Sequence, residues 1–407
     1  MERLRRDHTD DEEVRASVVE LFFDLVFVLV VTRLSNLLVH DLTVSGAART
    51  LFLLLVAWWA WIYTTWTTSW FDPEAEPVRA VLLLGMLASM FGAIAIPDAF
   101  GKDGLLLVAG YVAVQSVRNA FAVVATDADD PLHRPLVRIF AWNGWVGLIW
   151  LAGALVHGEA RVVVWLIALV CDYAGPPLGH WTPGYGRSSP REWELEPSHF
   201  VERLELFVLI ALGESIVAAG VTASNLDVTT DRLIAVGIAF AITVVVWWLY
   251  FDFHAEHALV HLREAADERA RIGRDLSYIH VVLVAGIIVV AVANEIVIQR
   301  PGEVPAGREL AILAAGPALY LLGSVGFKLR AIGFGWGKRL VATALVIAIA
   351  ALGTALPALA TWTLVLCVLG GLAGVEWIEL NRAPTRPTRG RGRRDARSAA
   401  AASARRP

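Results

Sequence analysis

The chain has 407 residues, of which 57% are hydrophobic and only 18% are charged, and its formal net charge is −4. Soluble globular proteins have roughly 25% charged and about 45–50% apolar residues. The composition therefore excludes an ordinary soluble domain and predicts an integral membrane protein. The two cysteines, Cys171 and Cys367, each lie in an apolar run. They form no metal-binding pair and imply no disulfide framework.

Twelve stretches are long and apolar enough to be membrane-spanning helices, each of which needs about 20 mostly apolar residues. Clusters such as "DPEAEP" and "TDADDPLHRP" separate them. The predicted spans are 18–38, 50–70, 78–97, 104–125, 136–156, 161–179, 198–220, 232–251, 276–298, 309–326, 339–356 and 358–378. We therefore predict an all-α fold, a polytopic membrane helix bundle of about twelve transmembrane helices. The sixth span is expected to be broken, and a very short turn at Pro357 joins the last two.

The distribution of Lys and Arg predicts the orientation, because cytoplasmic loops carry the excess of positive charge. With the N-terminal segment 1–15 inside, the inner loops collect far more Arg and Lys than the outer ones. An even number of spans then places both termini in the cytoplasm. The tail 382–407 contains nine arginines. We expect it to be disordered and to touch anionic lipid headgroups, with no nucleic-acid partner.

Two segments half a chain apart are alike. "ELFFDLVFVLVVTRLSN" and "ERLELFVLIALGESIVA" align without gaps, so that Asp24 matches Glu205 and Arg33 matches Glu214. The next span of each half ends similarly, in "WWAWIYTTWTTSWFD" and "WWLYFD". We predict two six-helix halves, 16–196 and 197–381; the alternative is a chance similarity between two apolar helices that carry acids. Parallel repeats of this kind occur in transporters, with the site between the halves.

Some motifs are specific enough to suggest a family. "ELFFDLVFV" opens the first span and "HFVERLELFVLIALGESIVA" opens the seventh, with support from "CDYAGPP" and "SYIHVVLVAG". Together they resemble the bacterial low-temperature-requirement A family, over nearly the whole chain between Glu20 and about Glu379. The resemblance implies a multi-pass protein of the bacterial cell (inner) membrane, named for a growth phenotype in the cold. It implies no particular molecular activity.

Charged residues inside membrane spans are expensive and commonly functional. Glu20 and Asp24 are four residues apart, so both carboxylates face one side of the first span. Arg33 falls on the opposite face. It either pairs with Glu214, which lies at a matching depth in the seventh span, or reaches the lipid headgroups. The charge-balancing candidates are Arg33, Arg118, Arg203 and Glu202, of which Arg118 lies at the depth to neutralise Asp24 or Glu205.

Asp172 is predicted near the middle of the sixth span. Only two residues separate it from "GPP". The first proline should break the helix there, and irregular backbone at membrane depth is tolerated only beside protein or a water-filled cavity. His280 lies in the inner half of the ninth span, where an acid, a His and an Arg could form a proton relay. The substrate- or proton-binding candidates are Asp172, Glu214, Asp24, Glu20 and His280. The alternative is that these charges only pair and lock the bundle together.

The chain shows no sign of a soluble catalytic apparatus. It contains no Walker loop, no G-x-S-x-G, no paired-Cys motif and no H-E-x-x-H. We expect no enzyme activity and no cofactor. His254, His257 and His261 share one helix face, but no complete metal shell is visible, so no metal site is predicted.

The leading hypothesis is a gradient-driven transporter or permease in the lipid bilayer that moves a small solute or a proton. Its buried carboxylates would lie at the interface between the two halves. One alternative is a non-catalytic membrane factor or sensor, which would use the arginine tail and the histidine-bearing helix. Another is a membrane-embedded enzyme acting on lipid, with Asp172 and His280 among its acid–base groups.

Overall fold

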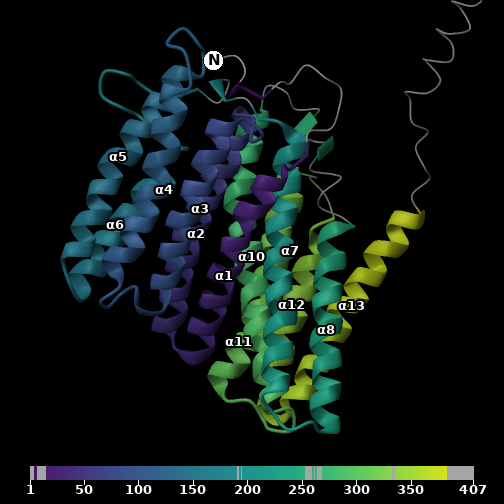
Figure 1. The fold of residues 1–407 in the computed structure, drawn as a ribbon. Coiled ribbons are helices and arrows are strands. Elements are labelled where there is room, and N and C mark those ends of the chain that lie inside the picture. Colours follow the sequence, from purple (N-terminus) through teal and green to yellow (C-terminus); the bar gives the residue numbers. More distant parts are fainter. Residues whose placement is uncertain are drawn as a thin grey trace, which may run out of the picture.

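The computed structural model describes residues 4–6, 15–189, 192–193, 195–252, 259–260, 262–263, 268–331, 333 and 335–382. These residues form a bundle of twelve α-helices of 16–31 residues, drawn in Figure 1. The helices are α1 (Val18–His40), α2 (Val44–Trp70), α3 (Glu76–Ala95), α4 (Gly104–Val124), α5 (His133–Leu155), α6 (Glu159–Ala174), α7 (Pro197–Ser224), α8 (Thr230–Phe251), α10 (Arg269–Gln299), α11 (Gly307–Ala331), α12 (Gly337–Leu352) and α13 (Ala358–Arg382). The 3₁₀ turns η2 (Ile96–Asp98) and η4 (Gly353–Ala355) follow α3 and α12. The prediction of an all-α bundle is confirmed.

Ten of the described helices are long and apolar enough, by length and composition, to cross a membrane. α1 and α6 are not among the ten, but both lie alongside the others (Figure 1). The chain is therefore a multi-pass helical membrane protein, while the count of twelve spans remains a prediction. The largest shift of a boundary is in α10, which begins at Arg269 and not at residue 276.

The sixth helix stops early. α6 ends at Ala174, before the predicted end at residue 179, because Pro176 and Pro177 cannot donate the helical hydrogen bonds and disfavour a helical residue before them. The predicted break is confirmed. Asp172 consequently lies in the last turn of α6, and its depth near the middle of the membrane span stays a prediction. The chain continues without helix over residues 175–189.

Polar side chains define where several apolar helices begin. The Ser17 hydroxyl accepts from the Glu20 N–H and the Glu20 carboxylate accepts from the Ser17 N–H, which is a capping box at the start of α1. The hydroxyls of Thr43 and Thr229 cap α2 and α8 in the same manner. Pro197 occupies the first position of α7, where its missing N–H is not needed.

The central element is α10, which packs against α1, α2, α7, α8, α11 and α13. The backbones of α10 and α11 approach each other closely. A Cβ on Gly286 would collide with the backbone nitrogen of Tyr320, and one on Gly316 would lie 2.8 Å from the backbone nitrogen of Val290. Glycines at such positions let two membrane helices approach closely, and packing is a main source of their association. α10 and α11 therefore form one tightly joined pair.

Neighbouring helices pack in a similar order in the two predicted halves. In the first half the successive contacts are α1–α3, α3–α4, α4–α5 and α5–α6. In the second half the corresponding contacts are α7–α10, α10–α11, α11–α12 and α12–α13. The corresponding helices differ in burial, since α3 exposes Leu83, Leu84 and Leu87 whereas α10 is mostly buried. α1 and α7 contact each other across the predicted boundary. The internal repeat and the division at residue 196 remain predictions.

Residues 4–6 form an N-terminal strap across one end of the bundle. The Arg6 N–H donates to the Trp70 carbonyl at 3.1 Å, and Arg5 Nη1 lies 2.5 Å from an oxygen of Asp130. The start of α1 and the final ends of α2 and α13 lie at this same end (Figure 1). We call it the strap end.

Several predictions concern residues outside the described ranges. These are most of the segment 1–15, the histidine face formed by His254, His257 and His261, and the basic tail after Arg382. The cytoplasmic placement of the termini also remains a prediction.

Candidate functional site

One cluster of buried charge joins α1 to α7. Arg203 Nη1 lies 2.6 Å from Asp24 Oδ2, and Arg203 Nη2 lies 2.8 Å from Asp24 Oδ1. Trp61 of α2 donates its Nε1–H to Asp24 Oδ1 at 2.8 Å. Asp24 is 3% exposed and Arg203 is 0% exposed. This bidentate, desolvated pair makes Arg203 the counter-charge of Asp24, in place of the predicted Arg118.

Glu20 belongs to the same cluster. His199 Nε2 lies 2.7 Å from Glu20 Oε1, and the guanidinium groups of Arg6 and Arg203 approach the carboxylate to 3.8 Å. His199 was not among the predicted site residues. The signal was its spacing, because His199 and Arg203 are four residues apart and so share one face of α7.

Glu202 contacts the chain that leads into α1. Its carboxylate accepts a hydrogen bond from the backbone N–H of Ala16 at 2.7 Å. No ion pair joins it to a residue within the described ranges, so its charge-balancing role stays a prediction.

The predicted pair of Arg33 and Glu214 is wrong. Glu214 is 3% exposed and accepts from the Thr32 hydroxyl at 2.5 Å. Arg33 is exposed, and the structure joins it to no carboxylate in the part of the chain it describes. Successive helix residues differ by about 100° in direction, so the neighbour of an inward-facing threonine faces elsewhere. Arg33 therefore follows the other alternative and points out of the bundle.

Asp172 is the acid at one end of a second buried hydrogen-bond network, which joins α4, α5 and α6. Its Oδ2 accepts from the Tyr111 hydroxyl at 2.7 Å and from Trp150 Nε1 at 2.8 Å. Gln115 donates to the Tyr111 oxygen at 2.9 Å and accepts from the Arg118 guanidinium. We call Asp172, Tyr111, Gln115 and Arg118 the polar chain. Neither Tyr111 nor Trp150 was singled out from the sequence, since an aromatic residue in a span gives no sign of its hydrogen bond.

Arg118 is buried at 3% exposure without a direct ion pair among the described residues. Its nitrogens donate to Gln115, Asn119 and the carbonyl of Ala60, and its guanidinium carbon lies 5.0 Å from the centre of the Tyr63 ring. Asp172 interacts with it electrostatically from the far end of the polar chain. Two opposite charges are thus buried near each other but kept apart by neutral side chains.

His280 lies in another part of the bundle. Its Nε2 is 3.0 Å from the Tyr250 hydroxyl, and its Nδ1 is 3.0 Å from the Leu276 carbonyl. Both hydrogen bonds stay within α8 and α10. The predicted relay of an acid, His280 and an arginine is therefore not formed by the described residues.

A third charged cluster was missed altogether. Lys328 Nζ lies 2.6 Å from Glu376 Oε1, and Arg339 Nη2 lies 2.8 Å from Glu376 Oε2. All three residues are at most 2% exposed. Lys328 lies after the predicted span 309–326 and Arg339 is the first residue of the span 339–356, so both cations fall at the ends of predicted spans. The available signal was Glu376 itself, because an acid within the predicted span 358–378 requires a partner.

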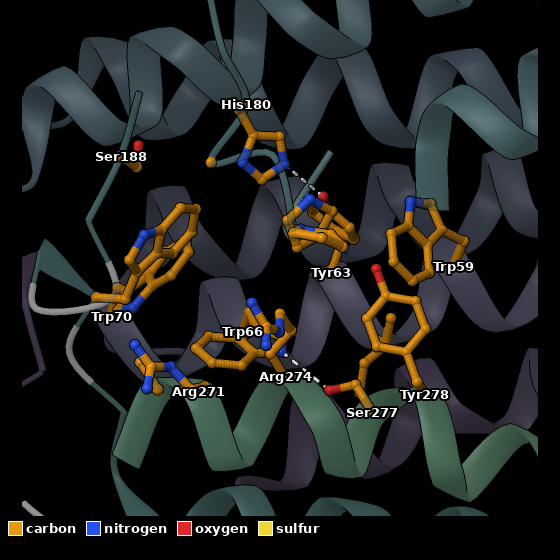
Figure 2. A pocket seen from close by; sticks show the side chains of 16 residues that line it. Trp59, Tyr63, Trp66, Trp70, His180, Ser188, Arg271, Arg274, Ser277 and Tyr278 are labelled. Atoms are coloured by element: carbon orange, nitrogen blue, oxygen red, sulfur yellow. Dashed lines mark hydrogen bonds between the residues drawn. The ribbon is translucent and has the colours of Figure 1, made fainter. Parts of the chain in front are cut away.

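A cavity of about 110 Å³ lies at the strap end, between α2, the start of α10 and the non-helical segment after α6 (Figure 2). Its walls are mainly aromatic. The aromatic side chains that line it are Trp59, Tyr63, Trp66, Trp70, Trp193 and Tyr278. We call it the aromatic cavity. It is not lined by Asp24, Asp172, Glu214 or His280.

The polar side chains that line the aromatic cavity are cationic or neutral among the described residues. Arg271 and Arg274 of α10 line it beside Trp66 and Trp70 (Figure 2). The Arg271 side chain is 50% exposed, so the cavity reaches the molecular surface there. Among the described residues that line the cavity there is no Asp or Glu.

His180 connects the cavity with the polar chain. Its Nε2 lies 2.7 Å from the Tyr63 hydroxyl (Figure 2), and Arg118 lies over the ring of the same tyrosine. His180 has a φ of 47°, the one positive value outside glycine in the described chain. Strain of this kind costs about 1–3 kcal/mol and is concentrated at functional sites. The aromatic cavity and the polar chain are consequently one continuous candidate site.

A metal site receives no support from this arrangement. No group of three or more His, Cys, Asp and Glu within the described ranges is placed to hold a metal ion. The three histidines considered above lie outside those ranges, so the expectation about them is untested.

The long apolar helices, their exposed apolar surfaces and the charges that face inward define a multi-pass helical membrane protein in a lipid bilayer. The chain belongs to the family described as bacterial low temperature requirement A protein, whose family model matches residues 15–373. The resemblance found in the motifs is thereby confirmed. An uncharacterized protein of Rhizobium meliloti (strain 1021) is 36% identical over 327 residues, which cover 80% of this chain and 79% of that protein. No solved structure matches the chain significantly.

Proposed function

We propose that this chain is a gradient-driven transporter or permease that moves a small solute, together with a proton, across the bacterial inner membrane. The aromatic cavity is its solute site and Asp172 is its proton site. Both termini, and with them the strap end, face the cytoplasm, as the excess of Lys and Arg in the inner loops indicates. The chain is then a carrier and not an enzyme.

The observation that carries this proposal is the cavity beside a broken helix. α6 ends at Ala174, and the segment after it reaches Tyr63, which lies seven residues, or about 10 Å, before the end of α2. Discontinuous helices that line a cavity at membrane depth are a recurrent feature of transporter binding sites. The Arg271 rim gives this cavity access to the surface.

The proton site is supported by the separated charges of the polar chain. Protonation of Asp172 would remove the acid that balances Arg118 through Gln115 and Tyr111, so its protonation depends on what other charge approaches Arg118. The protonation of Asp24, which is paired directly with Arg203, does not depend on a further charge in this way. We assign Asp24 and Glu20, with Arg203 and His199, to holding α1 against α7. Glu214 is a second candidate proton site, and His280 assists at most indirectly.

Proteoliposomes loaded with a pH-sensitive dye test the proposal. In the presence of a solute that is carried, the wild type should acidify the lumen and Asp172→Asn should abolish that signal. Glu214→Gln should reduce it if Glu214 also binds protons. Glu74→Gln is the matched control, because Glu74 is an exposed acid paired with Arg79.

Unchanged proton movement and solute uptake in Asp172→Asn and in Glu214→Gln would refute the assigned roles. A membrane lipid species that appears only with active protein would instead favour the lipid-enzyme alternative. Loss of cold growth on deletion of the tail after Glu379, with normal insertion, would favour a sensor.

A further inference from the structure

We propose that the ligand of the aromatic cavity is a planar organic anion, namely a small aromatic carboxylate. The binding claim stands on the cavity itself, and only the claim that the anion is carried rests on the proposed function. Three features of the cavity and one of its surroundings support this ligand class.

The first feature is the shape and chemistry of the walls. Trp66, Trp70 and Trp193 lie with ring centres 5.7–6.3 Å apart in each pair. On the other side Trp59 stacks on Tyr173 at 4.0 Å and meets Tyr278 at 5.6 Å. Aromatic side chains attract other rings through offset stacking and edge contacts. A flat, apolar ligand body fits between such walls.

The second feature is the charge of the side chains that line the cavity, where Arg271 and Arg274 are the charged residues among the described ones. Arg274 donates to Asp275 at 2.8 Å, and Arg330 donates to the same carboxylate at 2.7 Å. Two arginines therefore share one acid, and Arg271 pairs with the exposed Glu268 at 3.2 Å. An aromatic cage with a carboxylate would suit a cation. Because the described cavity walls contain no carboxylate, this cage favours an anion.

The third feature is a pair of buried nitrogens without partners. His180 is 1% exposed and Trp59 is 2% exposed, and both line the cavity. His180 Nδ1 and Trp59 Nε1 have no hydrogen-bond partner among the described residues. When the Tyr63 hydroxyl donates to His180 Nε2, the ring proton is on Nδ1. A carboxylate supplies the acceptor that a buried N–H donor requires.

The surroundings link this anion to the proton. Tyr63 lines the cavity and also lies under Arg118. An anion in the cavity therefore helps to balance Arg118, which makes the negative charge of Asp172 less necessary. Proton uptake by Asp172 and anion binding should then favour each other, because coupling between two sites is reciprocal. The neutral side chain introduced by Asp172→Asn should likewise strengthen anion binding.

A series of three probes tests the charge preference directly. Benzoate, benzamide and benzamidinium have nearly the same planar shape but are negative, neutral and positive at neutral pH. Equilibrium dialysis of the radiolabelled probes against the purified full-length protein in nanodiscs measures binding. We expect benzoate to bind at least about tenfold more tightly than benzamide, the effect of one charge-assisted hydrogen bond, and benzamidinium not to bind. Equal binding of all three probes, or preference for benzamidinium, would overturn the inference.

Variants then locate the site. Arg274→Gln should weaken benzoate about tenfold and leave benzamide unchanged, the behaviour expected when one charged contact is lost. Arg79→Gln, at an exposed arginine paired with Glu74 outside the cavity, should change neither. Asp172→Asn should bind benzoate more tightly than the wild type, an outcome that a merely structural aspartate would not produce. Weaker or unchanged benzoate binding in Asp172→Asn would refute the link to the proton.

The two proposals fail in different ways. Benzoate binding without any uptake into proteoliposomes would refute the carrier and retain the ligand class. Proton-coupled uptake of a solute with no preference for benzoate in the probe series would retain the carrier and refute the ligand class.

Discussion

Asp24 and Asp172 are two buried carboxylates held in opposite ways. Asp24 makes a two-bond contact with Arg203, at 2.6 and 2.8 Å. Asp172 accepts from neutral donors, Tyr111 and Trp150, and the cation of its network, Arg118, is two side chains away. Both acids are buried at 2–3% exposure, so the depth of burial does not distinguish them.

The difference teaches how to separate structural from functional charge in a membrane bundle. A direct pair satisfies both ions and leaves little for a ligand to gain, whereas removal of one partner leaves the other buried alone. A separated pair can respond to a third charge. The first arrangement should therefore dominate stability and the second should dominate transport.

The largest expected effect is the loss of stability in Arg203→Gln. Removing the cation leaves Asp24 buried without its counter-charge, which should cost about 3–5 kcal/mol in the free energy of unfolding. Unfolding of the detergent-solubilised protein, followed by tryptophan fluorescence, measures it. The double variant Asp24→Asn, Arg203→Gln should recover a large part of the loss. A double variant less stable than Arg203→Gln alone would contradict the direct pairing.

Glu376 extends the comparison to a second direct cluster. Glu376→Gln should destabilise the bundle by about 3 kcal/mol, because it removes the negative charge that two buried cations, Lys328 and Arg339, share. Glu379→Gln is the control, since the Glu379 side chain is 52% exposed and the change should stay within about 0.5 kcal/mol. If both variants lost the same stability in unfolding measurements, the buried cluster would have no special role.

Asp172→Asn should have a small effect on stability and a large effect on transport. The amide oxygen can still accept from Tyr111 and Trp150, so we expect a loss of only about 1 kcal/mol in stability. Proton-coupled uptake in proteoliposomes should nevertheless disappear. A loss of stability as large as that of Arg203→Gln, with uptake retained, would abolish the distinction between the two carboxylates.

The smallest effect concerns the N-terminal strap at acidic pH. Partial burial raises the pKa of Asp130, but the hydrogen bond and charge of Arg5 outweigh it, so the pKa lies below its ordinary value. The pair then contributes stability above the ordinary pKa of about 4, and this contribution is lost as the pH falls through the lowered value.

For such a partly exposed pair we expect less than about 1 kcal/mol. The difference in unfolding free energy between the wild type and Asp130→Asn should therefore shrink as the medium becomes acidic. A difference that stays constant from neutral to strongly acidic pH would show that the ionised Asp130 contributes nothing.

The helices were largely predictable, since apolar length is a strong signal in a chain of this kind. The starts of α1 at Val18, α4 at Gly104 and α13 at Ala358 coincide with the predicted spans. The end of α6 needed more than hydropathy: the apolar run extends to residue 179, whereas Pro176 marks the break that leaves Asp172 in the last helical turn. The start of α10 at Arg269 was missed because its first turns are charged and lie before the apolar run.

The candidate site was predictable only in part. Burial of Asp24, Asp172 and Glu214 followed from their place in apolar spans. Their partners did not, because the depth of a residue in its span leaves open which neighbouring helix it faces. Arg118 and Arg203 were both available to Asp24, and only the three-dimensional packing of α1 on α7 selects between them. The aromatic cavity was beyond the sequence, since it depends on where the non-helical chain after α6 returns.

The glycine contacts between α10 and α11 have a mechanical consequence. With Gly286 against the backbone of Tyr320, sliding of one helix past the other would break this close contact, so we expect the pair to move as one unit. In the proposed carrier, alternation between inward-open and outward-open forms would be made by helices that move relative to this pair. The group α4, α5 and α6, of which α6 carries Asp172, lies at one edge of the bundle (Figure 1), and we expect this group to move in the proposed carrier.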